Sequence, residues 1–262
     1  MAGASLADTN PAERRVLTID EQRTWSGVGR LNHSRGGFCS GALIAPDTVL
    51  TAAHCVVDEA TNGAVAPRDL RFVAGLRTGV YTAHRRAVEA KTHPDWSGYR
   101  GDGKIVVAGD IAVVKLEAPI STVEALNFKT GAAPEEGDPV TLVSYGRGRE
   151  GALSIQEPCY VLRRYAASVE LNCDSVNGTS GAPVFNAAGE VVAVISASER
   201  GVREDGGPLR SFAVIVDGAL PALRPREAIA TRAPSGGVAD RFRRAPSAGG
   251  TRLPGGSRAP TQ

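Results

Sequence analysis

Long apolar runs are absent from this 262-residue chain. No run approaches the roughly 20 residues that a helix needs to cross a bilayer, so no membrane span is expected. The first residues lack a basic stretch followed by an apolar one, so no signal peptide is expected in this chain. Hydrophobic residues make up 42% and charged residues 22% of the sequence, which is typical of a chain that folds around its own core.

Cysteines are few, with four in the chain, and no Cys-x-x-Cys or His-x₃-His spacing accompanies them. A zinc site is therefore disfavoured, and neither a metal nor another cofactor is expected. Four cysteines allow three disulfide pairings. Pairing of near neighbours, Cys39 with Cys55 and Cys159 with Cys173, is the simplest. Disulfides persist in oxidising compartments, so the protein is expected to be secreted or periplasmic.

Helical periodicity is also scarce, and its best case is a short segment at 217–224. Short apolar runs separated by turn residues instead favour an all-β sandwich or barrel. A loop rich in Gly, Pro and Glu at 131–139 divides these runs into two similar halves. Strands are expected at 28–31, 39–45, 48–53, 70–74, 87–91, 105–108 and 111–116, and at 140–145, 159–162, 167–171, 182–186, 190–197 and 211–216.

The ends of the chain differ in composition from its middle. Residues 1–21 are polar and are expected to form a loose N-terminal arm ahead of the two halves, 22–130 and 131–223. The last segment, 224–262, carries eight arginines against two acidic residues and is rich in Ala, Pro, Gly and Ser. It cannot bury enough apolar surface to offset its ordering entropy, so disorder is expected. Without interleaved aromatic residues it does not predict nucleic-acid binding.

A serine lies between glycines in the sequence GTSGAP at 178–183. A hydroxyl becomes an effective nucleophile only with a base to take its proton and donors to hold the oxyanion. Gly178 has no Cβ and could turn its N–H inward, so that the N–H groups of Gly178 and Ser180 point at one spot. The alternative is an ordinary turn between strands.

A base and a residue to orient it are the other requirements. His54 lies at the end of an apolar run, beside a cysteine, and is the candidate base; the alternative is a packed structural histidine. Asp110 immediately precedes another apolar run, where its carboxylate would be costly to desolvate without a donor. An imidazole N–H would meet that need and would itself be held in one tautomer. The alternative for Asp110 is a turn residue.

Three segments together resemble the signature segments of the chymotrypsin/trypsin-like serine proteases: LTAAHC at 50–55, GDIAVVKL at 109–116 and GTSGAP at 178–183. The resemblance covers residues 22–222 and implies two six-stranded antiparallel β-barrels with a short C-terminal helix. It also implies that Ser180 is the nucleophile, His54 the general base and Asp110 the residue that holds the imidazole. Gly178 and Ser180 would form the oxyanion hole. The expected partners are protein or peptide substrates, and a monomer is expected.

The sequence departs from the animal enzymes at Thr179, because those enzymes carry an aspartate before the nucleophile that receives a newly cut N-terminus. This departure favours the bacterial secreted branch, which includes glutamyl endopeptidases. Asp174 matches the floor of the primary specificity pocket and favours cleavage after Arg or Lys, although it could instead cap a turn. Ser175, Ser196 and Ser198 are expected to line the pocket or to pair with the substrate backbone.

Other functions are weighed against this one. Cleavage after Glu usually needs a histidine on the pocket-wall strand, and residues 194–198 contain none. An α/β-hydrolase has its histidine after the serine, and no histidine follows Ser180. A catalytically inactive protease homologue that acts as a binding module is the remaining non-enzyme alternative.

Overall fold

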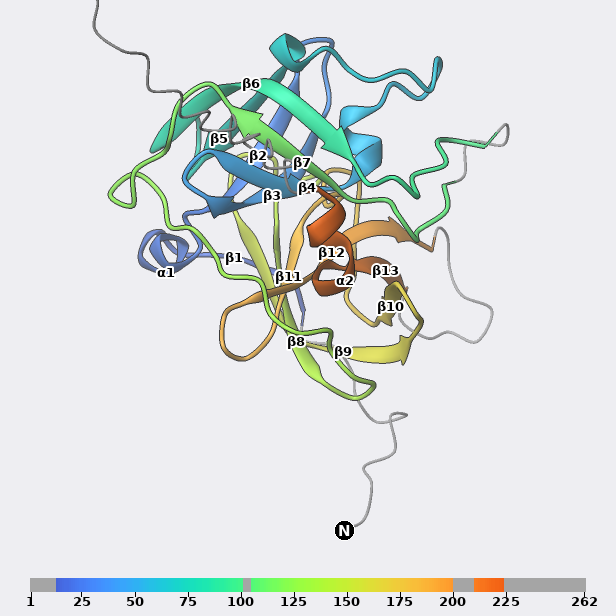
Figure 1. Ribbon diagram of the computed structural model, residues 1–262. Helices are drawn as coiled ribbons and strands as arrows, with labels where there is room; N and C mark the ends of the chain where they lie inside the picture. The colour runs from blue at the N-terminus through green and yellow to red at the C-terminus, as the bar shows by residue number, and fades with distance from the viewer. Residues whose placement is uncertain (1–12, 101–104, 200–209, 224–262) are drawn as a thin grey trace, which may run out of the picture. The chain divides into compact units, whose positions relative to one another are not determined.

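The computed structural model describes residues 13–100, 105–199 and 210–223. Two antiparallel sheets, each closed into a six-stranded barrel, follow one another along the chain (Figure 1), which confirms the expected all-β double barrel. No helix in the described ranges is long and apolar enough to cross a membrane. The arginine-rich segment 224–262, expected to be disordered, lies outside the described residues.

The first barrel closes in the order β2-β3-β4-β7-β6-β5. Its side chains alternate between core and surface, as in β7, where Ala112, Val114 and Leu116 are buried and the residues between them are half-buried. Phe72 fills the centre and leaves no room for a side chain at Gly29. The strands are β2 (Val28–His33), β3 (Phe38–Ala45), β4 (Thr48–Thr51), β5 (Leu70–Ala74), β6 (Ala83–Thr92) and β7 (Ala112–Leu116), with 3-10 helices at Ala53–Val56 and Pro67–Asp69.

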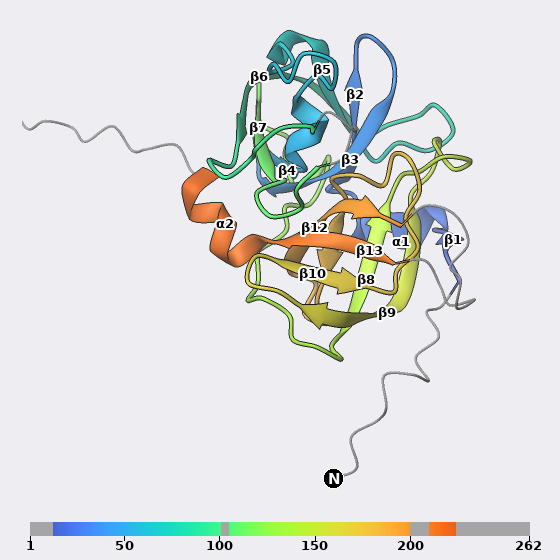
Figure 2. The ribbon, with the colours of Figure 1, turned by 90° about the vertical axis from the view of Figure 1, so that its right-hand side faces the viewer.

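The second barrel runs β9-β10-β13-β12-β11-β8 and closes through the pairing of β8 with β9. Its core is a separate apolar cluster that includes Leu142, Val169 and Val184. The strands are β8 (Pro139–Ser144), β9 (Ser154–Arg164), β10 (Ser168–Leu171), β11 (Pro183–Phe185), β12 (Val191–Ser198) and β13 (Ser211–Ile215), and helix α2 (Val216–Leu223) follows. Figure 2 shows α2 following directly after β13. Its residues, 216–223, nearly coincide with 217–224, the segment expected to be helical.

Within the expected N-terminal arm, residues 15–16 form a strand and a helix begins at residue 19, so the expectation of a loose lead-in is wrong for these residues. Strand β1 (Arg15–Val16) pairs with β9 and adds a seventh strand to the second sheet (Figure 2). Leu17 is fully buried, and Thr18 forms a capping box with Glu21 at the start of helix α1 (Ile19–Thr24). One buried leucine and a Thr-x-x-Glu cap therefore order a stretch whose polar composition alone suggested a loose arm.

The strand expected at 105–108 is not formed; within the described residues, 105–111 contains no strand. The N–H of Asp110 instead donates to the carbonyl of Val107 over 3.0 Å, and Gly109 adopts a φ of +86°. This conformation favours glycine and turns the chain into β7. The apolar side chains of Ile105 and Val107 line a cleft, which explains an apolar run without a strand.

Candidate active site

A buried carboxylate holds the candidate base. His54 lies in the 3-10 helix that follows β4, and its Nδ1 is 2.7 Å from Oδ2 of Asp110. The backbone N–H of His54 donates to Oδ1 of the same carboxylate over 2.8 Å. Asp110 is fully buried and the His54 side chain is 14% exposed. Because an ionised carboxylate only accepts hydrogen bonds, Nδ1 carries the proton, and Nε2 of the neutral ring is an acceptor.

A third donor to this carboxylate comes from the second barrel. Ser196 of β12 is 3% exposed, and its hydroxyl donates to Oδ2 of Asp110 over 2.5 Å. Ser196 lines the cavity, as expected from the sequence, and its hydroxyl is engaged by Asp110, a contact that the sequence did not predict. Three hydrogen bonds compensate the cost of burying the Asp110 charge.

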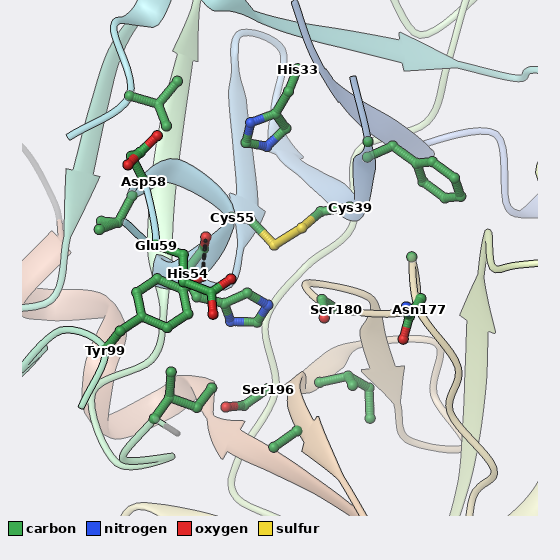
Figure 3. A pocket seen from close by; sticks show the side chains of 18 of the residues that line it. His33, Cys39, His54, Cys55, Asp58, Glu59, Tyr99, Asn177, Ser180 and Ser196 are labelled. Atoms are coloured by element: carbon green, nitrogen blue, oxygen red, sulfur yellow. Dashed lines mark hydrogen bonds between the residues drawn. A yellow bond between two sulfur atoms is a disulfide. The ribbon is translucent and has the colours of Figure 1, made fainter. Parts of the chain in front are cut away.

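Ser180 lies in the same cavity as His54, and Figure 3 shows the two side chains pointing toward one another. No hydrogen bond joins their side chains in the part of the chain that the structure describes, and without substrate such contacts are often loose. Gly178 has a φ of +93°, and a Cβ there would lie 2.4 Å from the Phe38 ring. Among the described residues, the N–H groups of Gly178 and Ser180 have no protein acceptor, so both are available to an oxyanion.

Ser40 of β3 connects the first barrel to the serine loop. Its N–H donates to the carbonyl of Ser180 over 2.8 Å, and its hydroxyl donates to the carbonyl of Gly178 over 2.9 Å. That hydroxyl also accepts from the N–H of Tyr145 over 3.0 Å. This role of Ser40 was not predicted from the sequence. The available signal was one polar residue inside the apolar run 39–45.

The cavity around His54 and Ser180 is open and has a volume of about 1970 Å³. Ser175 and Ser198 line it, as the sequence analysis expected, but Asp174 is not among its lining residues. Asp174 is half-buried, and its backbone N–H donates to the side chain of Gln156 over 2.9 Å. Asp174, the expected pocket floor, is therefore not part of the lining of this cavity.

Tyr99 packs beside the base (Figure 3), and its hydroxyl donates to the backbone carbonyl of His54 over 3.2 Å. Burial, together with the nearby negative charges of Glu59 and Asp110, raises the pKa of Tyr99 to about 12. The phenol therefore remains protonated, and a hydrogen-bond donor, well above neutral pH. Burial, followed by repulsion from His54, lowers the pKa of His33 at the edge of the cavity.

The cysteines form the two local pairs, Cys39 with Cys55 and Cys159 with Cys173, as predicted. The first disulfide joins β3 to the 3-10 helix that carries His54, so it restrains the base covalently. Cys39, His54 and Cys55 lie within metal-ligand distance of one another. Both sulfurs are used in the disulfide, so this cluster has no thiolate to offer a metal.

Two closed barrels that meet at a histidine–carboxylate pair and a serine loop define the chymotrypsin-like fold class. Residues 39–194 match the trypsin-like peptidase domain, and these residues are more than half of the chain. The chain therefore belongs to the trypsin-like peptidase family, as the three signature segments predicted.

Individual relatives agree with this assignment. Brachyurin from Leptuca pugilator is 30% identical over 152 residues, which are 54% of this chain and 58% of that protein. Trypsin from Saccharopolyspora erythraea is 30% identical over 120 residues, 44% of this chain and 46% of that protein. The chain thus spans about half the length of the curated relatives it matches. A solved structure of a Glu endopeptidase in complex with MPD matches with a TM-score of 0.63 at 20% identity, covering 78% of this chain and 91% of that one, which shows the fold alone.

Proposed function

We propose that this protein is a serine endopeptidase that cuts peptide bonds with Ser180 as nucleophile, His54 as general base and Asp110 as the residue that orients the imidazole. The observation that carries the proposal is the 2.7 Å contact between the buried Asp110 carboxylate and Nδ1 of His54. It directs a neutral imidazole with a free Nε2 toward a serine in the same cavity.

In the proposed reaction, Oγ of Ser180 bonds to the carbonyl carbon of the substrate and its proton passes to Nε2 of His54. The N–H groups of Gly178 and Ser180 hold the oxyanion, where the loss of one donor typically costs about 3 kcal/mol of activation free energy. His54 then gives the proton to the leaving amine as the C–N bond breaks. Water, deprotonated by the same ring, hydrolyses the acyl-enzyme and returns Ser180.

Among the described residues, the end of β12 pairs with β13 on one side and with no strand on the other, which leaves an edge for the substrate backbone. β11 pairs with β12 as far as Val194, whereas β12 continues to Ser198. An extended peptide could therefore add antiparallel to residues 196–198, beside the nucleophile. The two disulfides support a secreted or periplasmic location.

For the side chain before the cut, we propose Arg or Lys. Asp174 supplies a half-buried carboxylate six residues before the nucleophile, and its neighbour Ser175 lines the cavity. Two of the curated relatives are named trypsin. The second candidate is cleavage after Glu, as in the Glu endopeptidase with the same fold. The absence of histidine from 194–198 disfavours it.

A fluorophosphonate probe tests the triad, because it reacts only with an activated serine. Wild type and the Ser34→Ala control, which removes an exposed hydroxyl at the cavity rim, should be labelled at the same rate. Ser180→Ala should not be labelled. A folded wild type that resists the probe would favour the inactive homologue that acts as a binding module.

Specificity requires a separate experiment. Digestion of a mixed peptide library, read by mass spectrometry, should give cuts after Arg and Lys, and Asp174→Asn should reduce these cuts relative to the others. Cuts after Glu that persist in Asp174→Asn would instead establish the second candidate.

A further inference from the structure

The N-terminal arm brings an arginine to the serine loop. Arg14 immediately precedes β1, and its Nη1 donates to Oγ1 of Thr179 over 3.5 Å, across 165 positions of sequence. Thr179 is the residue before the nucleophile and is fully buried. Its Oγ1 also accepts from the N–H of Val176 over 3.2 Å, and its own N–H donates to the carbonyl of Val176 over 2.9 Å. Thr179 is thus the point at which the arm meets the tight turn before Ser180.

The Arg14 guanidinium lies partly buried beside Gly146 and Thr179. A Cβ placed on Gly146 would lie 2.8 Å from a methyl group of Val176 and 3.2 Å from Oγ1 of Thr179, so a glycine here lets the backbone approach the serine loop, with Nη1 of Arg14 at van der Waals distance. Burial lowers the pKa of Arg14; the negative charge of Asp174 opposes that shift, and the positive charge of Arg149 adds to it. Nη2 of Arg14 is buried and has no hydrogen-bond partner among the described residues.

The arm is anchored independently of this contact. β1 pairs with β9, and the N–H of Leu17 donates to the carbonyl of Leu153 over 2.9 Å. The guanidinium of Arg77 then donates to the carbonyl of Leu17 over 2.7 Å. The backbone that carries Arg14 is therefore already fixed, so the entropy lost in holding its side chain at the serine loop is reduced.

We propose that Arg14 is a positioning residue for the serine loop: held by the anchored arm, it fixes Thr179 and with it the N–H groups of Gly178 and Ser180. The inference rests on the proposed peptidase function. It makes the activity depend on a segment of the chain that lies before both barrels.

The test compares Arg14→Ala and Arg14→Lys with Arg15→Ala, a matched control in the adjacent position. Arg15 forms a solvent-exposed ion pair with Glu21 and lies outside the site. Arg14→Ala should lower kcat and the rate of fluorophosphonate labelling by about tenfold or more, the effect of losing one charge-assisted contact that acts on the transition state. KM should change far less. Arg14→Lys should recover part of the rate, and Arg15→Ala should stay within about twofold of wild type.

Two further readouts separate positioning from a general loss of structure. Guanidinium chloride at millimolar concentration should raise the labelling rate of Arg14→Ala and leave Arg15→Ala unchanged. Amide hydrogen exchange at Thr179 should be faster in Arg14→Ala, because its bond to Val176 opens more often.

Labelling and exchange rates of Arg14→Ala within twofold of wild type would overturn the inference. A lower melting temperature of Arg14→Ala, together with a labelling rate that does not respond to guanidinium, would also overturn it. If wild type itself is not labelled, the proposed peptidase function fails, and the exchange rate at Thr179 still decides whether Arg14 holds the loop.

Discussion

Ser196→Ala is the sharpest test of how the site is held together. The substitution removes one hydroxyl and leaves the strand, the carboxylate and the imidazole in place. Ser196 and Asp110 lie 86 positions apart in sequence, and their 2.5 Å hydrogen bond spans the two barrels. The variant therefore measures how much one hydroxyl from the second barrel contributes to stability and to kcat through the His54–Asp110 pair of the first barrel.

The expected magnitude follows from the surroundings of Asp110. Its carboxylate is fully buried, so water cannot replace the lost donor. A hydrogen bond to a charged group is worth about 1.5–3 kcal/mol, so the free energy of unfolding should fall by about that amount. Two donors from His54 remain in Ser196→Ala, so we expect its kcat to fall only about three- to tenfold. In Asp110→Asn the side chain presents the wrong hydrogen-bonding group to the ring, and kcat should fall by about 10⁴-fold.

Urea titration and steady-state hydrolysis of the best library peptide measure the two effects. Ser198→Ala, in the same strand and half-buried, controls for the stability effect of removing a serine hydroxyl, since Ser198 has no bond to Asp110. Its free energy of unfolding should stay within about 0.5 kcal/mol of wild type. If Ser196→Ala is equally neutral, the hydroxyl does not sustain the buried carboxylate and the reasoning is wrong.

Three other expectations follow. Gly181→Ala should lower the free energy of unfolding by more than about 3 kcal/mol, because the φ of Gly181 is +78° and the new Cβ would lie 2.3 Å from a β3 carbonyl oxygen. Gly189, at φ +74°, has open space around it, so Gly189→Ala should lower the free energy of unfolding by less in the same urea titration. Tyr99→Phe should lose the bond to the His54 carbonyl and about 1 kcal/mol of stability while keeping most of kcat. Hydrogen bonds from the Arg15 side chain and from Thr18 at the α1 cap lower the pKa of Glu21 from 4.5 to about 2. The ionised Glu21 therefore stabilises the folded state above pH 4.5, and this contribution is lost as the pH falls toward 2. Glu21→Gln should flatten that part of a plot of melting temperature against pH.

The His54–Asp110 pair could be predicted because each residue borders an apolar run. A carboxylate beside a buried strand needs a donor, and a histidine at a strand end can supply one. The hydroxyl of Ser196 carries no comparable signal, since a serine in an apolar strand is equally compatible with several partners. Arg14 could not be placed either, because its contact depends on the pairing of β1 with β9, and a two-residue strand is too short to show a periodic pattern.

The prediction of the fold was right where hydrophobic alternation was clear, and it was wrong where a turn or a helix cap determined the local structure. The apolar run at 105–108 forms cleft wall, because Gly109 turns the chain before a strand can pair. The N-terminal arm is ordered by Leu17 and a helix cap that its polar composition concealed. In both places one to three residues outweigh the composition of the segment around them.

The geometry of the proposed oxyanion hole depends on which peptide planes are fixed. An N–H shares a rigid plane with the carbonyl of the preceding residue, so holding that carbonyl orients the N–H. The carbonyl of Asn177 accepts from the N–H of Arg147 over 2.7 Å, which orients the N–H of Gly178, and the carbonyl of Thr179 accepts from the N–H of Ala182 over 2.9 Å, which orients the N–H of Ser180.

The neighbouring planes are restrained as well. The carbonyls of Gly178 and Ser180 are both held by Ser40 of the first barrel, and the N–H of Gly181 donates to the carbonyl of Ile195 over 2.7 Å. Both N–H groups are therefore aimed before any substrate arrives, so little reorganisation is needed when charge develops on the oxyanion. Because one barrel supplies Ser40 and the other supplies the loop, this preorganisation exists only when the two barrels are folded together.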